Sequence, residues 1–247
     1  MIKTFVYDGT FDGLLTCVYD YYYSKCDVEE IVCSDSLPGD FIHDLISVTT
    51  SQEKADKVLA AIREKIGLDA LKNIFTVFLS EESCMEMLLL SYIKLGFKLG
   101  KNIEHHLHNE VVLKVMKTCS RVNFETHRLN GFIRFKCVGK ELYYAAIEPD
   151  HNILTLLAPH FAERFSNMRW IIHDVKRELA VLYNCEQWVL APMSRESSKE
   201  FISAEDNFYE NLWKTYYSTV AIEERENPRL RRRLMPSRYW KYIIEVQ

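Results

Sequence analysis

The apolar pattern of the chain changes once, near residue 130, and this change limits the fold more than any other feature of the sequence. Before it, apolar residues recur every three or four positions, as at Val58, Ile62 and Ile66, which is typical of one face of an α-helix. After it, short alternating runs at 132–138 and 141–148 flank a Gly-Lys pair, as in a β-hairpin. The pattern predicts an α+β protein with a helix-rich first half.

The second half of the sequence predicts a ββαββ unit. A second hairpin is expected from the runs 169–174 and 178–183, and a helix over 152–165 separates the two hairpins. We expect one antiparallel sheet with helices over one face. The segment 187–199 is typical of a linker, and a last helix is predicted from Ser203 onward.

The first half is expected to open with a short strand, a turn and a helix. Residues 2–7 form the apolar run, and the turn Asp8-Gly9-Thr10 leads into a helical pattern from Phe11. A second short strand is predicted over 30–33, followed by helices up to about residue 128. One of these helices begins with Thr50 and Glu53 at capping-box spacing.

The length and composition of the chain indicate an ordered protein that buries a sizeable core. The chain has 247 residues, of which 48% are hydrophobic and 27% charged, and this balance excludes wholesale disorder. We expect a single domain over 1–247, with a helix-rich part over about 1–129 and a part over about 130–247 that holds the ββαββ unit and C-terminal helices.

Charge is distributed unevenly along the chain. The net charge is −4, yet residues 225–247 carry seven basic residues against two acidic ones, so the preceding residues are strongly acidic. A basic end on an acidic body indicates either an anionic partner or an intramolecular clamp onto the acidic part. The candidate nucleic-acid-binding residues are Arg229, Arg231, Arg232, Arg233, Arg238, Tyr239, Trp240 and Lys241. The alternative packs Tyr239 and Trp240 into the core and leaves the arginines in water.

The seven cysteines have no spacing that suits a metal or an iron–sulfur cluster. No signal peptide is predicted, and no apolar stretch is long enough to span a membrane. We therefore expect a cytoplasmic protein without a membrane partner, cofactor or metal, whose cysteines are reduced and mostly buried.

The turn after the first predicted strand is the first candidate site. Asp8 and Asp12 are candidate catalytic carboxylates there, with Gly9, Thr10 and Gly13 as candidate ligand-binding residues. Ligands often bind where a strand ends and a helix begins, because free N–H groups point outward. Neither a P-loop nor a GxGxxG motif is present. The alternative is that Asp8 or Thr10 caps the helix and the glycines permit the turn.

An acidic and histidine-containing group in the second half is the second candidate site. Predicted strands end at Glu148 and Asp174, and convergence of these ends would assemble groups suited to acid–base catalysis. No spacing of the HExxH kind supports a metal. The alternative gives them structural roles, with Asp150 as a helix N-cap. Candidate catalytic residues are Glu148, Asp150, His151, His173 and Asp174, and candidate ligand-binding residues are Arg134, His160 and Arg164.

Three segments resemble a bacterial family of uncharacterised proteins assigned to DNA metabolism or DNA repair. They are the opening YDGTFDGLLTCVYDYY, the central block from GFIRF to RWIIHD, and the closing LWKTYYSTVAIEERENPRLRRRLMPSRYWKY. The resemblance implies a neighbouring radical-SAM DNA modification or repair protein, and related domains fused to uracil-DNA-glycosylase-like domains. It assigns no reaction. Radical chemistry would belong to the partner, since this chain has no cysteine triad for a cluster.

Three functions are compatible with these features. The leading hypothesis is a nucleic-acid-associated accessory protein that helps a radical-SAM partner to hold DNA. The second is an enzyme in its own right, a hydrolase or glycosylase-like activity that uses the acidic and histidine groups. The third is a protein-interaction adaptor without DNA contact.

Overall fold

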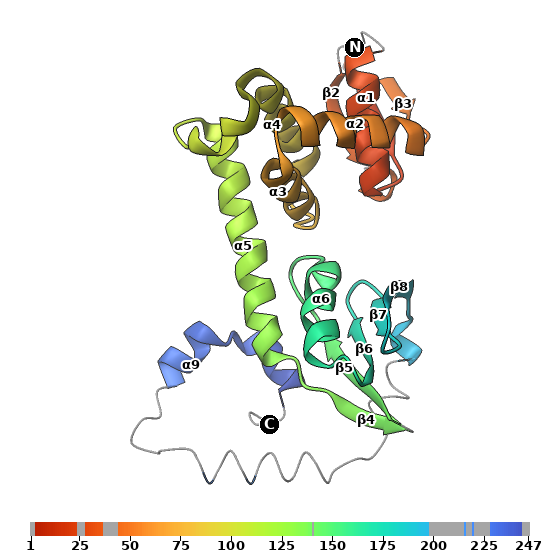
Figure 1. Cartoon of the computed structure of the whole chain (residues 1–247), viewed down its shortest axis with the longest axis vertical. Coiled ribbons are helices and arrows are strands. Elements are labelled where there is room, and N and C mark those ends of the chain that lie inside the picture. Colours follow the sequence, from red (N-terminus) through yellow and green to blue (C-terminus); the bar gives the residue numbers. More distant parts are fainter. Residues whose placement is uncertain are drawn as a thin grey trace. The chain divides into compact units, whose positions relative to one another are not determined.

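The computed structural model describes residues 3–23, 28–36, 44–139, 141–197, 215, 219 and 228–243. The chain forms two compact units, Met1–Asn123 and Phe124–Gln247, here called the N-terminal and C-terminal units. Each unit combines helices with its own sheet (Figure 1). This arrangement confirms the predicted α+β class.

The sheet of the N-terminal unit has three parallel strands in the order β2-β1-β3. They are β1 (Lys3–Tyr7), β2 (Val28–Cys33) and β3 (Asp44–Ser47). Helix α1 (Phe11–Tyr23) follows β1, so the predicted strand, turn and helix are confirmed. Strand β3 was not predicted, because most of its side chains are exposed and it has no apolar alternation. The carboxyl ends of all three strands lie at one edge, where parallel sheets commonly bind ligands.

Four further helices build the core of the N-terminal unit. They are α2 (Gln52–Lys65), α3 (Leu68–Phe78), α4 (Met85–Leu99) and the first part of α5 (Glu110–Phe132), with 3₁₀ turns η1 (Ser34–Ser36) and η2 (Gly100–His105). Their buried faces meet around Leu15, Ile62, Ile74 and Leu89. The predicted capping box at Thr50 is wrong. The N-cap of α2 is Ser51, and its side chain makes no capping hydrogen bond.

The sheet of the C-terminal unit has five strands in the order β4-β5-β6-β7-β8. They are β4 (Lys136–Gly139), β5 (Leu142–Ile147), β6 (Arg169–Asp174), β7 (Leu179–Tyr183) and β8 (Trp188–Pro192). Both predicted hairpins are confirmed as antiparallel pairs. A purely antiparallel sheet is wrong, because β5 and β6 are parallel. Helix α6 (Leu154–Arg164) returns the chain between them, as crossover connections of parallel strands do.

Two boundaries differ from the sequence expectation. Strand β8 lies inside the segment predicted as a linker and pairs with β7; most of its side chains are exposed or half-exposed. Helix α5 continues through Asn130 and Gly131, so the strand predicted from residue 132 begins only at Lys136. The first difference arises because an edge strand is held by backbone pairing rather than by burial of alternate side chains.

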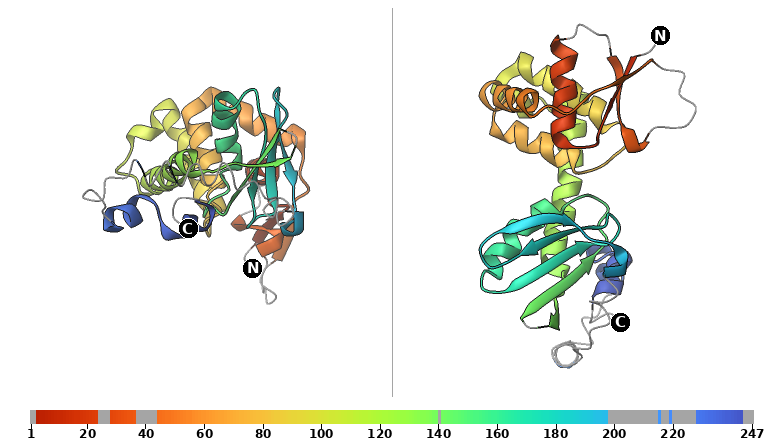
Figure 2. Two further views of the ribbon diagram at one scale, coloured as in Figure 1. Left: turned by 90° about the horizontal axis from the view of Figure 1, so that it is seen from below. Right: turned by 90° about the vertical axis from the view of Figure 1, so that its right-hand side faces the viewer.

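Helix α6 covers one face of the five-stranded sheet (Figure 2). Its Phe161 joins an aromatic cluster with Phe135, Trp170 and Tyr183, in which the Trp170 and Tyr183 rings stack with centroids 5.0 Å apart. Helix α9 (Pro228–Leu234) and the 3₁₀ helix η4 (Ser237–Tyr242) follow near the C-terminus. The helix predicted from Ser203 lies outside the described residues.

The described cysteines form no disulfide. Cys17 and Cys119 are buried, and burial raises the pKa of each thiol to about 12. The expectation of mostly buried cysteines is wrong, because Cys84 is exposed and Cys33, Cys137 and Cys185 are only partly covered. Across the described ranges, no helix is long and apolar enough to cross a membrane.

Candidate functional site

Asp8 lies just beyond the carboxyl end of β1 and is held by hydroxyl groups. Its Oδ1 accepts hydrogen bonds from the Thr10 backbone N (3.0 Å) and hydroxyl (2.7 Å), and its Oδ2 accepts one from the Thr50 hydroxyl (2.7 Å). Slight burial works to raise the pKa of Asp8, but the hydrogen bonds from Thr10 and Thr50 hold it below its ordinary value. Asp8 is therefore a fixed carboxylate that joins the start of α1 to the loop after β3.

The remaining residues of this turn complete a helix N-terminus. Thr10 is a capping residue, since its hydroxyl accepts the Gly13 backbone N–H at 3.0 Å. Gly9 has a φ of 77°, and a side chain there would meet the Cys33 sulfur. Asp12 contributes its backbone carbonyl to the Thr16 hydroxyl at 2.7 Å. These contacts match the alternative that Asp8 or Thr10 caps the helix, and Thr10 is the residue that does so.

Replacement of Gly13 by alanine is expected to destabilise the N-terminal unit by about 1–2 kcal/mol. A Cβ at Gly13 would lie 2.2 Å from Asp8 Oδ1 and 2.9 Å from the Thr50 hydroxyl, so Asp8 would have to leave its partners. Urea unfolding followed by circular dichroism measures the loss. Gly131→Ala is the control, because open space surrounds that helical glycine. Equal midpoints for the two variants would contradict this role of Gly13.

In the C-terminal unit, the buried carboxylate of Glu125 on α5 is the centre of a second cluster. It is 5% exposed and accepts the backbone N–H groups of Asp150 (2.9 Å) and His151 (3.0 Å). It also accepts the Tyr239 hydroxyl and lies 3.4 Å from the Arg238 guanidinium. Arg238 reaches Asp150 Oδ2 at 2.6 Å. The carboxylate of Glu125 thus joins η4 to the loop that precedes α6.

Glu148 makes the second link between this loop and η4. Lys241 donates to its Oε2, and the Tyr242 hydroxyl donates to its Oε1 at 2.6 Å. Partial burial works to raise the pKa of Glu148, but Lys241 and Tyr242 hold it below its ordinary value. We call this set the C-terminal clasp, and it consists of Arg238, Tyr239, Lys241 and Tyr242 bound to Glu125, Glu148 and Asp150. For these residues of the basic C-terminal segment, the structure thus matches the alternative of an intramolecular clamp onto acidic residues.

Asp174 is fully buried and pairs with Arg177. The Arg177 Nη1 lies 2.8 Å from Asp174 Oδ2, and the other oxygen accepts the backbone N–H groups of Lys176 and Arg177. The same guanidinium donates to the carbonyl oxygens of Pro149 (3.1 Å) and Asp150 (2.7 Å). Burial raises the pKa of Asp174, against the opposing effect of Arg177. Arg177 therefore joins the end of β6 to the loop that follows β5.

His173 is a buried structural histidine. Its Nε2 lies 3.0 Å from the Met193 carbonyl oxygen and its Nδ1 lies 2.8 Å from the Tyr144 hydroxyl. A carbonyl only accepts, so Nε2 carries the proton and Nδ1 accepts from Tyr144. Burial lowers the pKa of His173. Both ring nitrogens are thus occupied within the protein.

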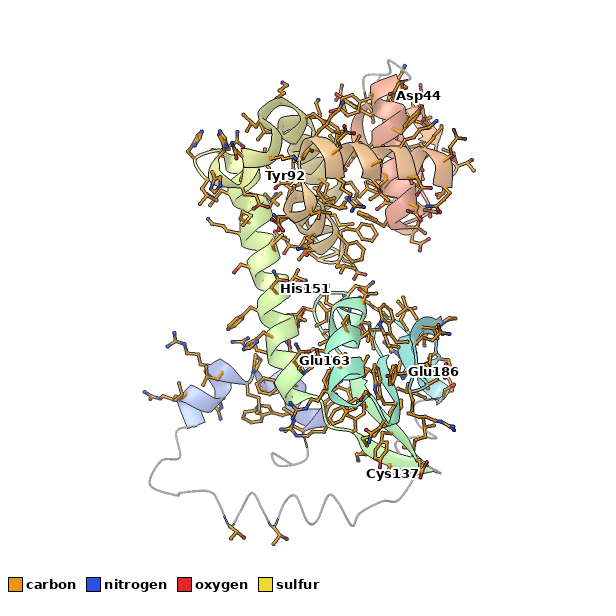
Figure 3. The ribbon with its side chains drawn as sticks, in the orientation of Figure 1. Asp44, Tyr92, Cys137, His151, Glu163 and Glu186 are labelled. Atoms are coloured by element: carbon orange, nitrogen blue, oxygen red, sulfur yellow. The ribbon has the colours of Figure 1, made fainter. Side chains whose placement is uncertain are left out.

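The other candidate residues of the C-terminal unit make local contacts; His151 is labelled in Figure 3. His151 gives its backbone N–H to Glu125, and the His160 ring meets Phe161 edge-on at 5.0 Å. Arg164 lies over the Phe165 ring. Arg134 donates to the carbonyl oxygens of Gly131 (2.8 Å) and Ile133 (3.3 Å) and so caps the end of α5. The expectation that Asp150 is a helix N-cap is wrong, because Ile153 takes that position.

The basic residues of the C-terminal segment fall into two groups. Arg238, Tyr239 and Lys241 belong to the clasp, and the Trp240 indole donates to the Met235 carbonyl at 3.0 Å. On α9, Arg229, Arg232 and Arg233 are exposed. Arg231 lies on the same helix, but its side chain is outside what the structure describes.

A half-buried arginine on α5 contacts α9 and lies beside an exposed phenylalanine of the same helix. Arg128 donates to the carbonyl oxygen of Arg233 at 3.1 Å, and its guanidinium lies 4.1 Å from the centre of the Phe124 ring, which is 53% exposed. We call this set the basic surface, and it comprises Phe124, Arg128, Arg229, Arg232 and Arg233. Its chemistry suits phosphate contact combined with stacking.

The sequence analysis did not identify Glu125 and Arg177 as site residues. Glu125 has a recognisable signal, because it interrupts an apolar helical stripe formed by Cys119, Val122 and Leu129. Arg177 has none, since a charged residue in a hairpin turn is ordinary. Within the described residues, no cluster of three or more His, Cys, Asp or Glu side chains is placed to hold a metal.

The C-terminal unit defines an α+β protein whose basic end folds back onto an acidic loop. The family model of a domain of unknown function, DUF4130, matches residues 83–245, about two thirds of the chain. The chain belongs to this family. The match includes every residue of the clasp and the basic surface, and leaves the turn with Asp8 and Asp12 outside. No curated protein and no solved structure matches the chain.

Proposed function

We propose that this DUF4130 protein is a nucleic-acid-associated protein of DNA metabolism or repair. The observation that carries the proposal is the basic surface of the C-terminal unit. Arg232 and Arg233 follow Arg229 by three and four residues, so both lie near Arg229 on one face of α9. Like charges at this spacing repel each other. Bound phosphates would remove this repulsion and release counterions from the nucleic acid.

The position of Phe124 supports the same interaction. An exposed ring beside the Arg128 guanidinium offers an apolar and cationic platform next to the α9 arginines. Bases stack on such platforms without strong sequence preference. The clasp keeps Arg238 and Lys241 on Glu125, Glu148 and Asp150, so phosphate contact is assigned to α9 and α5.

The accessory role follows from the family resemblance. The resemblance implies a neighbouring radical-SAM DNA modification or repair protein, and we propose such an enzyme as the partner. In this arrangement the DUF4130 protein holds the nucleic acid and the partner performs the chemistry.

A salt titration of DNA binding tests the proposal. We expect the affinity for duplex DNA to fall steeply with salt, and substitution of Arg229, Arg232 and Arg233 by alanine to reduce the log–log slope by about 1 per arginine. The control removes three exposed lysines of the N-terminal unit, Lys72, Lys101 and Lys117. An unchanged slope in the arginine variant would remove the basic surface from the proposal.

The titration is repeated with the radical-SAM partner present. Salt-sensitive binding by the protein alone supports direct contact with DNA. Binding that requires the partner, with no effect of the arginine substitutions, would make the protein an adaptor and would contradict the proposed DNA surface.

A further inference from the structure

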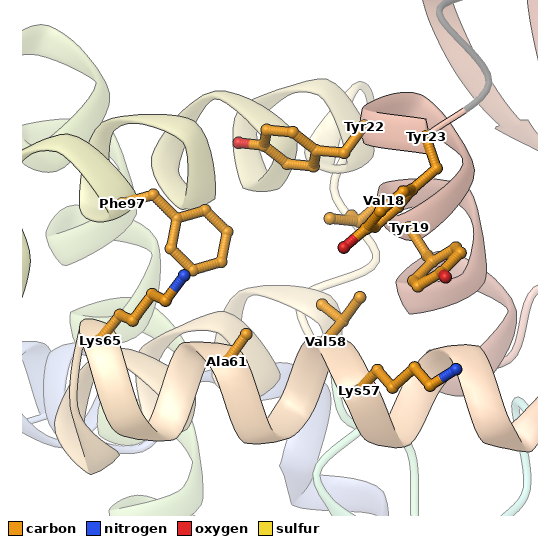
Figure 4. A pocket seen from close by; sticks show the side chains of 9 residues that line it. All are labelled: Val18, Tyr19, Tyr22, Tyr23, Lys57, Val58, Ala61, Lys65 and Phe97. Atoms are coloured by element: carbon orange, nitrogen blue, oxygen red, sulfur yellow. The ribbon is translucent and has the colours of Figure 1, made fainter.

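The N-terminal unit contains a groove of about 520 Å³ (Figure 4). Helices α1, α2 and α4 line it. This volume lies within the range of about 300–1,000 Å³ that small-molecule sites occupy. The groove lies outside both candidate sites of the sequence analysis.

Aromatic rings form much of its wall. Tyr22 and Tyr23 at the end of α1 are 44% and 71% exposed. The Tyr22 ring stands edge-on to Phe97 of α4 with centroids 5.9 Å apart, while Tyr23 stacks on Tyr19 at 4.3 Å. Two exposed rings that adjoin two half-buried ones around a single groove indicate a binding surface.

The charged groups of the groove are cationic. Lys57 and Lys65 line it from α2, and no acidic residue is among its described lining residues. Lys65 Nζ lies 5.8 Å from the centre of the Phe97 ring, and Lys57 Nζ lies 5.9 Å from that of Tyr19. Lys57 also pairs with Glu53, but both side chains are exposed, and such pairs contribute little.

The spacing of the two lysines defines the shape of the ligand. They stand eight positions apart on α2, which corresponds to about 12 Å along the helix. Ala61 lies between them, and its small side chain leaves the middle of the groove open. The groove therefore suits a flat aromatic group flanked by two negative charges. A hydrophobic peptide would match the rings but not the two ammonium groups.

We propose that this groove binds unpaired nucleotides of a single-stranded nucleic acid. A base stacks on the face of the Tyr22 ring with Phe97 at its edge, and the flanking phosphates lie at Lys57 and Lys65. Base–aromatic stacking combined with lysine–phosphate contact is the usual chemistry of single-strand binding. The inference goes beyond the proposed function, because its evidence lies entirely in the N-terminal unit and not in the basic surface.

Binding of a short fluorescein-labelled oligothymidylate to the full chain, measured by anisotropy, tests the inference. Ala61→Phe fills the groove without removing a ring or a charge, and Tyr22→Ala removes one stacking face. Each is expected to weaken binding roughly five- to a hundred-fold. Leu107→Ala is the matched control, because Leu107 is 51% exposed and lies outside the groove.

The arginine variant of the basic surface separates this inference from the proposed function. It is expected to weaken duplex binding, which Ala61→Phe should leave within about two-fold, since the two sites share no residue. Absence of oligothymidylate binding to the unmodified protein would overturn the inference. Equal affinity in the Ala61→Phe and Leu107→Ala variants, with circular dichroism showing both folded, would overturn it as well.

Discussion

Replacement of Glu125 by alanine is expected to lower the free energy of unfolding of the C-terminal unit by about 3–5 kcal/mol. The carboxylate is buried and has four partners, of which two are the backbone N–H groups of Asp150 and His151. Its removal leaves these donors without an acceptor in a dry environment, which costs about 1–3 kcal/mol for each buried group. It also removes the acceptor of the Tyr239 hydroxyl.

The measurement is urea unfolding followed by tryptophan fluorescence. All four tryptophans lie at or beyond position 170, so their emission reports on the C-terminal unit alone. Glu163→Ala is the matched control, because Glu163 is an exposed carboxylate on α6 (Figure 3). A change within about 0.5 kcal/mol is expected there. A loss below about 1 kcal/mol for Glu125→Ala would contradict the central role of Glu125.

Replacement of Arg177 by methionine is expected to cost a similar amount, about 3–5 kcal/mol at neutral pH. Methionine retains an unbranched apolar side chain but leaves the buried carboxylate of Asp174 without its cation. The carbonyl oxygens of Pro149 and Asp150 also lose their donor. Arg169→Met, at an exposed arginine of β6, is the control and should leave stability unchanged.

The pH dependence of this variant has a defined sign. The folded-state pKa of Asp174 already lies above its ordinary value of 3.8, and loss of Arg177 raises it further. As the pH falls through the raised pKa, Asp174 becomes protonated in the folded variant while it is still ionised in the unfolded chain. The free energy of unfolding of the variant therefore increases as the pH falls. The difference between Arg177→Met and the unmodified protein should therefore shrink from pH 7 towards pH 5.

The double variant Asp174→Asn/Arg177→Met provides the complementary test. It removes the buried negative charge together with its partner and should recover a large part of the loss at neutral pH. A penalty for Arg177→Met that stays constant with pH and persists in the double variant would show that Arg177 acts through its carbonyl contacts alone.

Substitution of an arginine is expected to have different effects in the clasp and in the basic surface. Arg238 binds Glu125 and Asp150, so its loss affects folding as well as any ligand contact. Arg229, Arg232 and Arg233 are exposed on α9, and their loss leaves these clasp contacts in place. Nucleic-acid binding is therefore tested at α9, where stability and binding are separable.

Local patterns in the sequence determined several elements of the fold. Strand β1, the turn with Asp8 and Thr10, both hairpins and helix α6 were predictable, because apolar period, glycine turns and caps act between residues close in the chain. The capping alternative for Thr10 was predictable for the same reason. The asymmetric charge also indicated that the basic end has an acidic partner within or outside the chain.

Other features were decided by the tertiary structure. Strands β3 and β8 gain their hydrogen bonds from neighbouring strands and bury few side chains, so no apolar alternation marks them. The parallel pairing of β5 with β6 depends on how α6 crosses the sheet. Glu125 and Tyr239 meet across 114 positions, and the groove combines side chains from three helices. Such contacts form only when distant segments pack together, because burial and charge pairing depend on neighbours in space rather than in sequence.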